Sequence, residues 1–384
     1  MSQRKDELPF LPFHRPTIYD HHIQAVSDTL RSGWLSSARK VEEFESAFAK
    51  VVGAKYAVAV NSCTAALHVA LVCLGVEPGD EVITSPITFV SAVSVVEHVG
   101  ATPVFVDVCP EDLTIDPESV RRRITKRTKV IVATHFAGFP AHMDELEKIA
   151  GGYGIPIVTD AAHAIEVVYR GRASGQLGKI SCYSFYPTKN ITSGEGGMLT
   201  TDDDVVADQA RSLRMNGVTK SAWDRYGPGG YKHWDVVRLG WKYNMSDVHA
   251  ALGLAQLKEL ESWLGQRVML DGAYRNYIDR DLVDVLEPDE TDMRWARHLF
   301  VVRVPSRDLV MDRIQKLGVG VGVHFRAVYR LKYYQEKYAV PADAFPVAEK
   351  ASEEVLSLPL YPSMEVKDVY RVIAALHDTI RNGK

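Results

Sequence analysis

The residues best suited to chemistry lie in the stretch 184–198, which reads SFYPTKNITSGEGGM. Lys189 has no acidic residue immediately beside it, and hydroxyl-bearing and small residues surround it. Burial disfavours the ammonium form of a lysine and so lowers its pKa. A neutral lysine amine is a nucleophile that forms a Schiff base with a carbonyl cofactor. The alternative is a solvated lysine on a surface turn, and this stretch alone leaves both interpretations open.

Three glycines follow the lysine, in the run Gly194-Glu195-Gly196-Gly197. Glycine adopts a positive φ without steric cost. We therefore expect the backbone to turn tightly here and to bend away from Lys189, which leaves its amine accessible.

A second candidate is Thr159-Asp160-Ala161-Ala162-His163, directly after the apolar run 155–158. Open α/β sheets bind ligands at the carboxyl ends of their strands. A carboxylate there can pair with the protonated ring nitrogen of a pyridine cofactor. His163 would then stack on the ring or donate a hydrogen bond to it. The alternatives are an aspartate that caps a loop and a histidine that only packs.

Two further segments lie where a helix is expected to begin. Residues 61–66 (NSCTAA) form a strand-to-helix turn, and the free N–H groups and dipole of a helix N-terminus bind phosphate. Lys242 and Asn244 lie at the start of a later helix, where they would suit an anion. The alternatives are ordinary helix caps, with Ser246 capping the second helix.

The order of phosphate turn, acid and lysine suits pyridoxal 5′-phosphate (PLP). This cofactor needs an anion cradle, a partner for its ring nitrogen and an amine for its aldehyde. The chain has no GxGxxG after a strand and no GxxxxGK[ST], which argues against nicotinamide and P-loop sites. It shows no metal-ligand spacing either.

Alternating apolar runs and helical patterns predict the scaffold. This alternation is typical of an α/β fold with a mostly parallel sheet that helices cover on both faces. The predicted strands are 56–60, 81–85, 103–106, 130–134, 155–159, 181–185 and 198–200, and the predicted helices are 64–74, 89–99, 117–124, 143–150 and 204–214.

The segments outside that alternation predict an N-terminal arm and a second domain. Thr17 is expected to cap a helix that ends near Arg31, before a loop that exposes Trp34, and a second helix is expected at 41–51. A long irregular loop at 217–240 is typical of a functional or mobile segment. The remaining predictions are one helix from 246 to about 280, strands at 298–304 and 319–324, and helices at 308–317 and 367–379. We expect a large domain over 1–250, and a linking helix with a smaller α+β domain over 251–384.

Composition limits the class of partner. The chain has 384 residues, 46% of them hydrophobic, and a net charge of −4. Neither nucleic acid nor a membrane is expected, and the basic run 121–129 reads as a solvated helix end. The first residues carry charges and prolines where a signal peptide needs an apolar core. Four cysteines without CxxC spacing indicate reduced thiols, so we expect a cytoplasmic protein.

The chain resembles the DegT/DnrJ/EryC1/StrS sugar aminotransferases, which have the type I PLP-dependent aminotransferase fold. The resemblance covers nearly the whole chain. It is carried by SGWLSS, NSCTAALH, GDEVITSPITFVS, GATPVFVDV, DAAHA, SFYPTKNITSGEGGM, KYNMSDVHAALGLAQL and SLPLYPSM. Within the family, Lys242–Asn244, Gly322–Ala327 and Lys332–Tyr334 most resemble the UDP-4-amino-4-deoxy-L-arabinose–oxoglutarate aminotransferases.

The resemblance implies a role for each candidate. Lys189 would hold the cofactor and shuttle the proton, and Asp160 would pair with the ring nitrogen. The other implied cofactor contacts are the backbone N–H groups of Thr64 and Ala65, the hydroxyl of Ser184, the side chains of Phe89 and His163, and Asn244 from the partner subunit of a homodimer with shared active sites. The implied substrate contacts are Trp34, Tyr186, Lys242, His324, Arg326 and Tyr333.

The implied reaction moves an amino group from glutamate to C4 of a UDP-linked keto sugar and leaves 2-oxoglutarate. Two departures bear on the sugar: Tyr186 replaces a common histidine, and Ala38-Arg39-Lys40 replaces a common GPK. The sugar therefore need not be the pentose. The alternatives are a different keto sugar, such as a dTDP sugar aminated at C3, and a non-catalytic PLP-binding regulator. Lys189 argues against the family's 3-dehydratases, which have histidine at that position.

Overall fold

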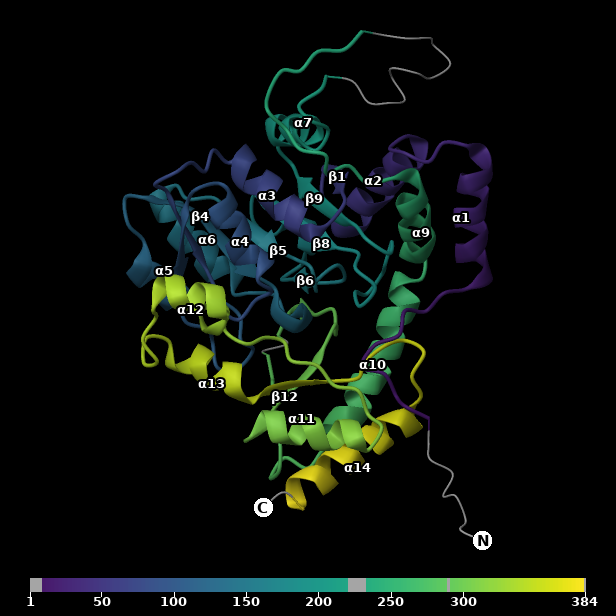
Figure 1. Cartoon of the computed structure of the whole chain (residues 1–384), viewed down its shortest axis with the longest axis vertical. Coiled ribbons are helices and arrows are strands. Elements are labelled where there is room, and N and C mark those ends of the chain that lie inside the picture. Colours follow the sequence, from purple (N-terminus) through teal and green to yellow (C-terminus); the bar gives the residue numbers. More distant parts are fainter. Residues whose placement is uncertain (1–8, 220–232, 289–290, 383–384) are drawn as a thin grey trace.

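The computed structural model describes residues 9–219, 233–288 and 291–382. A sheet of seven strands forms its centre, in the order β1-β9-β8-β5-β4-β2-β3 (Figure 1). Strand β9 is antiparallel to both of its neighbours, and the other pairs are parallel. The strands are β1 (Tyr56–Val60), β2 (Glu81–Thr84), β3 (Thr102–Phe105), β4 (Thr128–Thr134), β5 (Ile157–Asp160), β8 (Ile180–Ser184) and β9 (Gly197–Thr201).

Helices cover both faces of this sheet, as the alternating pattern predicted. They are α2 (Arg39–Val52), α3 (Cys63–Cys73), α4 (Ser91–His98), α5 (Pro117–Arg123), α6 (Met143–Tyr153), α7 (Asp204–Leu213) and α9 (Asp247–Leu257). Helix α1 (Asp20–Ser32) packs on the outer side of α9. Short 3₁₀ turns lie at Phe136–Gly138, Ser174–Gln176 and Val328–Arg330.

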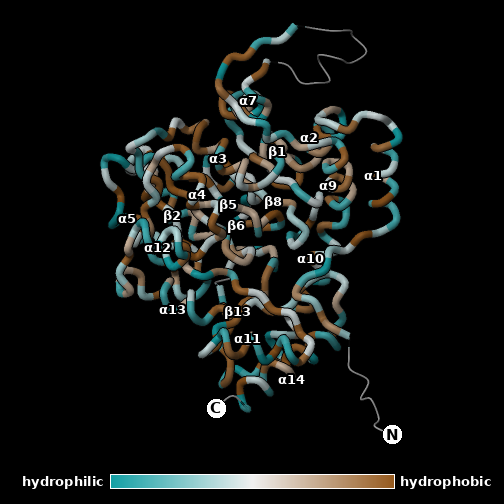
Figure 2. The backbone as a smooth tube through the Cα atoms, viewed as in Figure 1, coloured by the Kyte–Doolittle hydropathy of each residue, from teal (hydrophilic) through white to brown (hydrophobic). Residues whose placement is uncertain are grey.

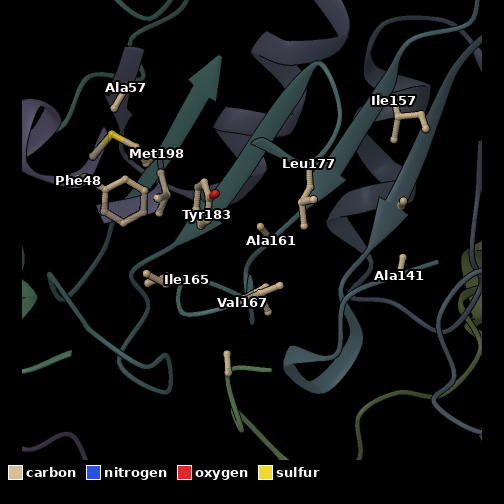
Figure 3. Close-up of a cluster of buried hydrophobic side chains, with 14 of the residues drawn as sticks. Phe48, Ala57, Ala141, Ile157, Ala161, Ile165, Val167, Leu177, Tyr183 and Met198 are labelled. Atoms are coloured by element: carbon tan, nitrogen blue, oxygen red, sulfur yellow. The ribbon is translucent and has the colours of Figure 1, made fainter. Parts of the chain in front are cut away.

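Successive strand residues pack into two separate cores, because side chains alternate across a sheet. Val58 and Val60 pack with α3, α4 and α7, whereas Ala57 and Ala59 pack with α2, α6 and α9. Figure 3 shows the second core, where Phe48 of α2 lies beside Tyr183 and Met198 of the sheet. Figure 2 colours the backbone by hydropathy, and apolar segments lie in and around the strands.

Below the sheet in Figure 1, helix α10 (Leu260–Tyr277) leads into a second group of elements. Its three-stranded antiparallel sheet has the order β10-β12-β13. Leu11 of the N-terminal segment packs into the same core and pairs with Val319. The elements are β10 (Asp284–Val285), β12 (Phe300–Arg303), β13 (Val355–Leu358), α11 (Arg307–Lys316), α12 (Lys332–Tyr338), α13 (Pro346–Glu354) and α14 (Val366–Arg381). A small third sheet joins β6 (Val168–Tyr169), β7 (Arg172–Ala173) and β11 (Met293–Arg294).

Three local predictions are wrong. Helix α1 begins at Asp20 with Tyr19 as its N-cap, so Thr17 does not cap it; the carbonyl of Thr17 instead accepts a hydrogen bond from Gln256. The helix predicted from 246 to 280 is two helices, α9 and α10, which break at 258–259. The strand predicted at 319–324 makes only isolated bridges.

Two other predictions concern the loop at 217–240 and the membrane. Part of that loop, 220–232, lies outside the described residues. Within the described ranges, no helix has the length and apolar character that crossing a membrane requires.

Candidate active site

The candidate catalytic residues meet at one edge of the central sheet. Strands β4, β5 and β8 run parallel and end at Thr134, Asp160 and Ser184. Thr134 lies opposite Asp160 in the register, and its hydroxyl is 3.1 Å from that of Thr88. The strand-end rule that singled out Asp160 would also have found Thr134, which the sequence analysis missed.

A cavity of about 740 Å³ opens at this edge. Eight of the predicted site residues line it: Thr64, Phe89, Asp160, His163, Ser184, Tyr186, Lys189 and His324. The other lining residues are Phe13, Ser62, Cys63, Thr88, Ser91, Thr134, Ala162, Thr188, Glu195, Gly196, Gly322, Val323 and Phe325. Phe13 carried no local signal, because it comes from the N-terminal arm.

Lys189 lies half-buried in the wall of this cavity. Its backbone N–H donates to the carbonyl of Tyr186 at 2.9 Å, which closes a tight turn under the side chain. Burial lowers the pKa of Lys189 to about 8, against the opposing effect of Asp160 and Cys63. The amine is therefore partly neutral near physiological pH, as a nucleophile for an aldehyde must be.

Asp160 is the buried acid of the site, with 4% of its surface exposed. The Ala162 N–H at 3.1 Å and the Cys63 thiol at 3.8 Å both donate to its Oδ1. Oδ2 is therefore left for a ligand. Burial raises the pKa of Asp160, while the Ala162 amide and Lys189 counteract that effect. A cationic ring nitrogen at Oδ2 would stabilise the carboxylate form.

The N-terminus of α3 forms an anion cradle beside Ser184. The hydroxyl of Ser62 caps the helix and accepts the N–H of Ala65 at 3.1 Å. That N–H, predicted to hold phosphate, is thus bonded to the cap. The N–H groups of Cys63 and Thr64 lie in the first turn, where the helix itself provides no acceptor. The Ser184 hydroxyl accepts only a long hydrogen bond, 3.4 Å, from the N–H of Tyr186.

His163 forms an aromatic wall with two residues from other parts of the chain. Its ring stacks on His298 at 4.3 Å and on Phe325 at 6.1 Å between centroids. Burial lowers the pKa of His163 well below its ordinary value, so the ring is neutral. Its Nδ1 is buried without a hydrogen-bond partner. Phe89, which is 57% exposed, lies 6.2 Å from Phe325.

A buried network that the sequence analysis missed anchors the lysine. The side-chain amide of Asn190 donates to both carboxylate oxygens of Glu166 at 2.7 Å. Its Oδ1 is 2.8 Å from Nδ1 of His298, which must then carry the proton. Asn190 therefore ties Lys189 to the residue that stacks on His163. Asparagine beside a lysine is a weak signal in sequence, because its partners are 24 and 108 residues away.

The glycines after Lys189 act differently from the prediction. Only Gly194 has a positive φ, of 83°. Gly197 instead belongs to β9 and touches the turn before α3, where a Cβ would come within 2.4 Å of the Ser62 carbonyl carbon. Gly197 is therefore required for close packing beneath the anion cradle.

Five predicted site residues besides Ala65 do not line the cavity. Asn244 donates to the Ser37 hydroxyl at 2.7 Å, and Lys242 donates to Asn244 at 2.5 Å. Tyr333 on α12 donates to Glu97 at 2.9 Å. Arg326 lines a separate cavity of about 1090 Å³. Trp34 is 38% exposed in the loop between α1 and α2.

These residues fit PLP on the chemistry of their side chains. One cavity wall offers an amine with a lowered pKa, a buried carboxylate with an open oxygen, and a helix N-terminus next to a serine hydroxyl. Those are the three partners that the aldehyde, ring nitrogen and phosphate of the cofactor require. Fold and site together define a PLP-dependent enzyme.

The chain belongs to the DegT/DnrJ/EryC1/StrS aminotransferase family, whose model matches residues 16–377. It is 43% identical, over the full length of both chains, to the spore coat polysaccharide biosynthesis protein SpsC of Bacillus subtilis. The putative sugar aminotransferase Spr1654 of Streptococcus pneumoniae, in its PMP form, is similar with a TM-score of 0.90 and 30% identity, covering 98% of this chain and 99% of that one. DesV of S. venezuelae, solved in complex with a ketimine intermediate, is similar with a TM-score of 0.87 and 31% identity. That match covers 97% of this chain and 98% of that one.

The comparisons confirm the family, the fold and the class of cofactor. The protein is a PLP-dependent sugar aminotransferase with the type I fold.

Proposed function

We propose that this enzyme transfers an amino group from glutamate to the C4 keto group of a UDP-linked sugar. The observation that carries the proposal is the convergence of Lys189, Asp160 and Ser184 with the start of α3 on one cavity of about 740 Å³. A volume of this size lies within the range of small-molecule sites. It leaves room for a sugar substrate beside the cofactor.

The side chains divide the chemistry among them. Bound PLP supplies the electron sink for the carbon that exchanges its proton. Lys189 takes that proton and returns it, since its pKa of about 8 lets one amine act as both base and acid. Asp160 would hold a positive charge at the ring nitrogen of the cofactor through its Oδ2. Ser184 and the first turn of α3 would hold the phosphate.

Glutamate is the proposed amino donor, because the enzymes that the chain resembles produce 2-oxoglutarate. That is the keto acid formed when glutamate gives up its amino group. The UDP and C4 assignments are supported by the Lys242–Asn244, Gly322–Ala327 and Lys332–Tyr334 patterns. Ala38-Arg39-Lys40 favours a sugar other than the pentose, and a dTDP sugar aminated at C3 is the second candidate. The name of the 43% identical relative favours a product that enters polysaccharide synthesis.

A homodimer with shared active sites is part of the proposal. Asn244 lies outside the cavity of its own subunit and is held by Ser37 and Lys242 at the start of α9. From there it would reach the phosphate site of a second copy, as the resemblance implies. The four cysteines are free thiols, which supports a cytoplasmic location.

A substrate panel tests the proposal. The purified enzyme is incubated with glutamate and with UDP- and dTDP-linked 3-keto and 4-keto sugars. Release of 2-oxoglutarate and the mass of the amino sugar are followed. The proposal expects the highest kcat/KM for a UDP-linked 4-keto sugar. Turnover of simple keto acids, with no turnover of any nucleotide sugar, would contradict it.

A further inference from the structure

A cluster of three side chains that can bind a metal ion lies outside the active site. Cys109 and Asp112 belong to the loop between β3 and α5, and His142 directly precedes α6. Helices α5 and α6 lie at the left of Figure 1. One donor atom of each residue lies within 4.8 Å of the other two. The sequence shows no metal-ligand spacing here, because the fold brings His142 to the loop from a later segment.

The distance between two of the donor atoms suits a tetrahedral ion. Nε2 of His142 is 3.2 Å from Oδ2 of Asp112. Zinc binds nitrogen and oxygen ligands at about 2.0–2.2 Å, which places two such ligands about 3.3 Å apart in a tetrahedron. The other oxygen of Asp112, Oδ1, accepts the N–H of Thr114 at 2.7 Å. The buried carboxylate is therefore held in place with Oδ2 beside the His142 ring.

The thiol of Cys109 supplies the third donor atom. Its sulfur is 4.0 Å from the carbonyl oxygen of Ile115, too far for a strong hydrogen bond. The backbone around it is closed on itself: the Cys109 N–H donates to the Thr114 carbonyl at 2.8 Å, and the Leu113 N–H donates to the Cys109 carbonyl at 2.9 Å. The loop thus fixes the sulfur near the His142–Asp112 pair.

The charges around the cluster favour a divalent cation. A thiolate, a carboxylate and a neutral imidazole together carry two negative charges, which a divalent ion cancels. Burial, followed by the carboxylates of Asp112, Asp116 and Glu111, raises the pKa of the Cys109 thiol. The hydrogen bond to Asp112 raises the pKa of His142. A metal ion bound here displaces the protons that these shifts retain.

A second cluster, of His21, His22 and Glu259, also has donor atoms within 4.8 Å of one another. The N–H of Tyr19 donates to Nδ1 of His22 at 3.0 Å, so the neutral ring carries its own proton on Nε2. Both ring nitrogens of His22 are therefore occupied, and this cluster has only two available ligands.

We propose that Cys109, Asp112 and His142 bind one zinc ion, with a water molecule in the fourth position. Thiolate and imidazole ligands suit zinc, whereas magnesium and calcium take oxygen ligands. None of the three residues lines the large cavity, so the site does not depend on the sugar reaction.

The loop that carries the cluster also holds elements of the C-terminal part of the chain. The carbonyl of Pro110 accepts a hydrogen bond from Arg303 of β12 at 3.0 Å. The carboxylate of Asp107 accepts the N–H of Ala348 in α13 at 2.8 Å. A zinc ion that fixes this loop therefore stabilises the contact between the central sheet and the C-terminal elements.

Metal content tests the site in solution. The holoenzyme is stripped with EDTA, loaded with zinc chloride and desalted, and its zinc is counted by mass spectrometry. We expect one zinc ion per chain. Competition with a chromophoric chelator should show that Cys109→Ala and His142→Gln each raise the dissociation constant by at least about tenfold. The matched control is Cys73→Ala, which removes a partly buried thiol 3.9 Å from a carbonyl outside the cluster, and it should bind zinc as wild type does.

Diffraction data at the zinc absorption edge locate the ion. In crystals of the zinc-loaded holoenzyme we expect an anomalous peak about 2.3 Å from the sulfur of Cys109. A peak only at His21 and Glu259, or none at Cys109, would overturn the proposal.

Thermal unfolding tests the stabilising role. EDTA should lower the thermal midpoint of the zinc-loaded wild type but not that of Cys109→Ala, because a ligand stabilises only a protein that binds it. A wild type that retains no zinc, or a wild-type dissociation constant in both ligand variants, would contradict the site. The visible absorption of the bound cofactor shows that each variant is folded. None of these readouts uses transamination, so a failure of the proposed sugar reaction stays distinguishable from a failure here.

Discussion

The backbone of Gly197 in β9 lies against the carbonyl of Ser62, at the point where α3 begins. A Cβ on Gly197 would come within 2.4 Å of the Ser62 carbonyl carbon and within 2.6 Å of the Cys63 nitrogen. Both contacts are backbone, which cannot swing away as a side chain can. Strand β9 thus fixes the position of the first turn of α3, which forms the anion cradle, relative to the sheet.

Gly197→Ala should therefore weaken both the fold and cofactor binding. We expect a loss of about 1–3 kcal/mol in the free energy of unfolding, the scale of overpacking. Urea denaturation measures this loss, and cofactor titration measures the affinity. Gly265→Ala in α10 is the control, because a Cβ there meets nothing within 4 Å, and it should stabilise by up to about 1 kcal/mol. Equal stability of the two variants would contradict the packing argument.

Asp160→Asn should lower kcat far more than stability. An asparagine keeps the volume but removes the negative charge at Oδ2, so we expect a loss of about 10²-fold or more, the scale of one preorganised electrostatic partner. Steady-state kinetics and the absorption spectrum of the bound cofactor measure the effect. Asp203→Asn weakens the cap of α7 and the ion pair with Lys179, neither of which lines the cavity, and should keep wild-type kcat. Wild-type kcat in Asp160→Asn would contradict the proposed role of the Asp160 carboxylate.

The reaction of the apoprotein with cofactor should depend on pH with a midpoint near 8. Burial lowers the pKa of Lys189 to about 8, so the reactive neutral amine forms as the pH rises through that value and is lost below it. The rate of recombination with PLP is measured from pH 6 to 11.5. The same series is repeated with pyridoxal, which has the aldehyde but no phosphate. A midpoint that is unchanged with pyridoxal belongs to the lysine and not to the phosphate. A midpoint near 10.5, the ordinary value, would mean that the lysine is not desolvated.

Shared active sites predict complementation between two inactive variants. Lys189→Ala removes the amine, and Asn244→Ala removes the proposed contact from the partner. If each site combines Lys189 of one chain with Asn244 of the other, an equal mixture forms hybrid dimers with one intact site, and about a quarter of wild-type activity returns. Separate purified variants and freshly mixed samples are compared. If both variants are folded and dimeric and their mixture recovers no activity, Asn244 does not contribute to the partner's active site.

The sequence allowed the strand-and-helix alternation to be predicted well, because buried parallel strands are short apolar runs that helices separate. Asp160 and the start of α3 could be found because each lies where an apolar strand ends, whereas the role of Ser184 came from the family resemblance. The break between α9 and α10 could not be predicted, because the helical spacing of apolar residues continues through 258–259.

Other features depend on contacts between distant parts of the chain. Phe13 reaches the large cavity only because the N-terminal arm pairs with the segment around Val319. Asn190 bonds Glu166 and His298, whose positions no local pattern gives. Arg267 reads as a solvated helix residue, yet the fold buries it behind Lys189.

The central claim is that Lys189 is the residue that carries the cofactor. The most direct test reduces the native holoenzyme with borohydride, which fixes an amine-bound cofactor covalently, and then maps the modified peptide by mass spectrometry. The account predicts one pyridoxyl group per chain, on Lys189, and none after prior conversion of the enzyme with glutamate. A modification on another lysine, or none on Lys189, would contradict the account.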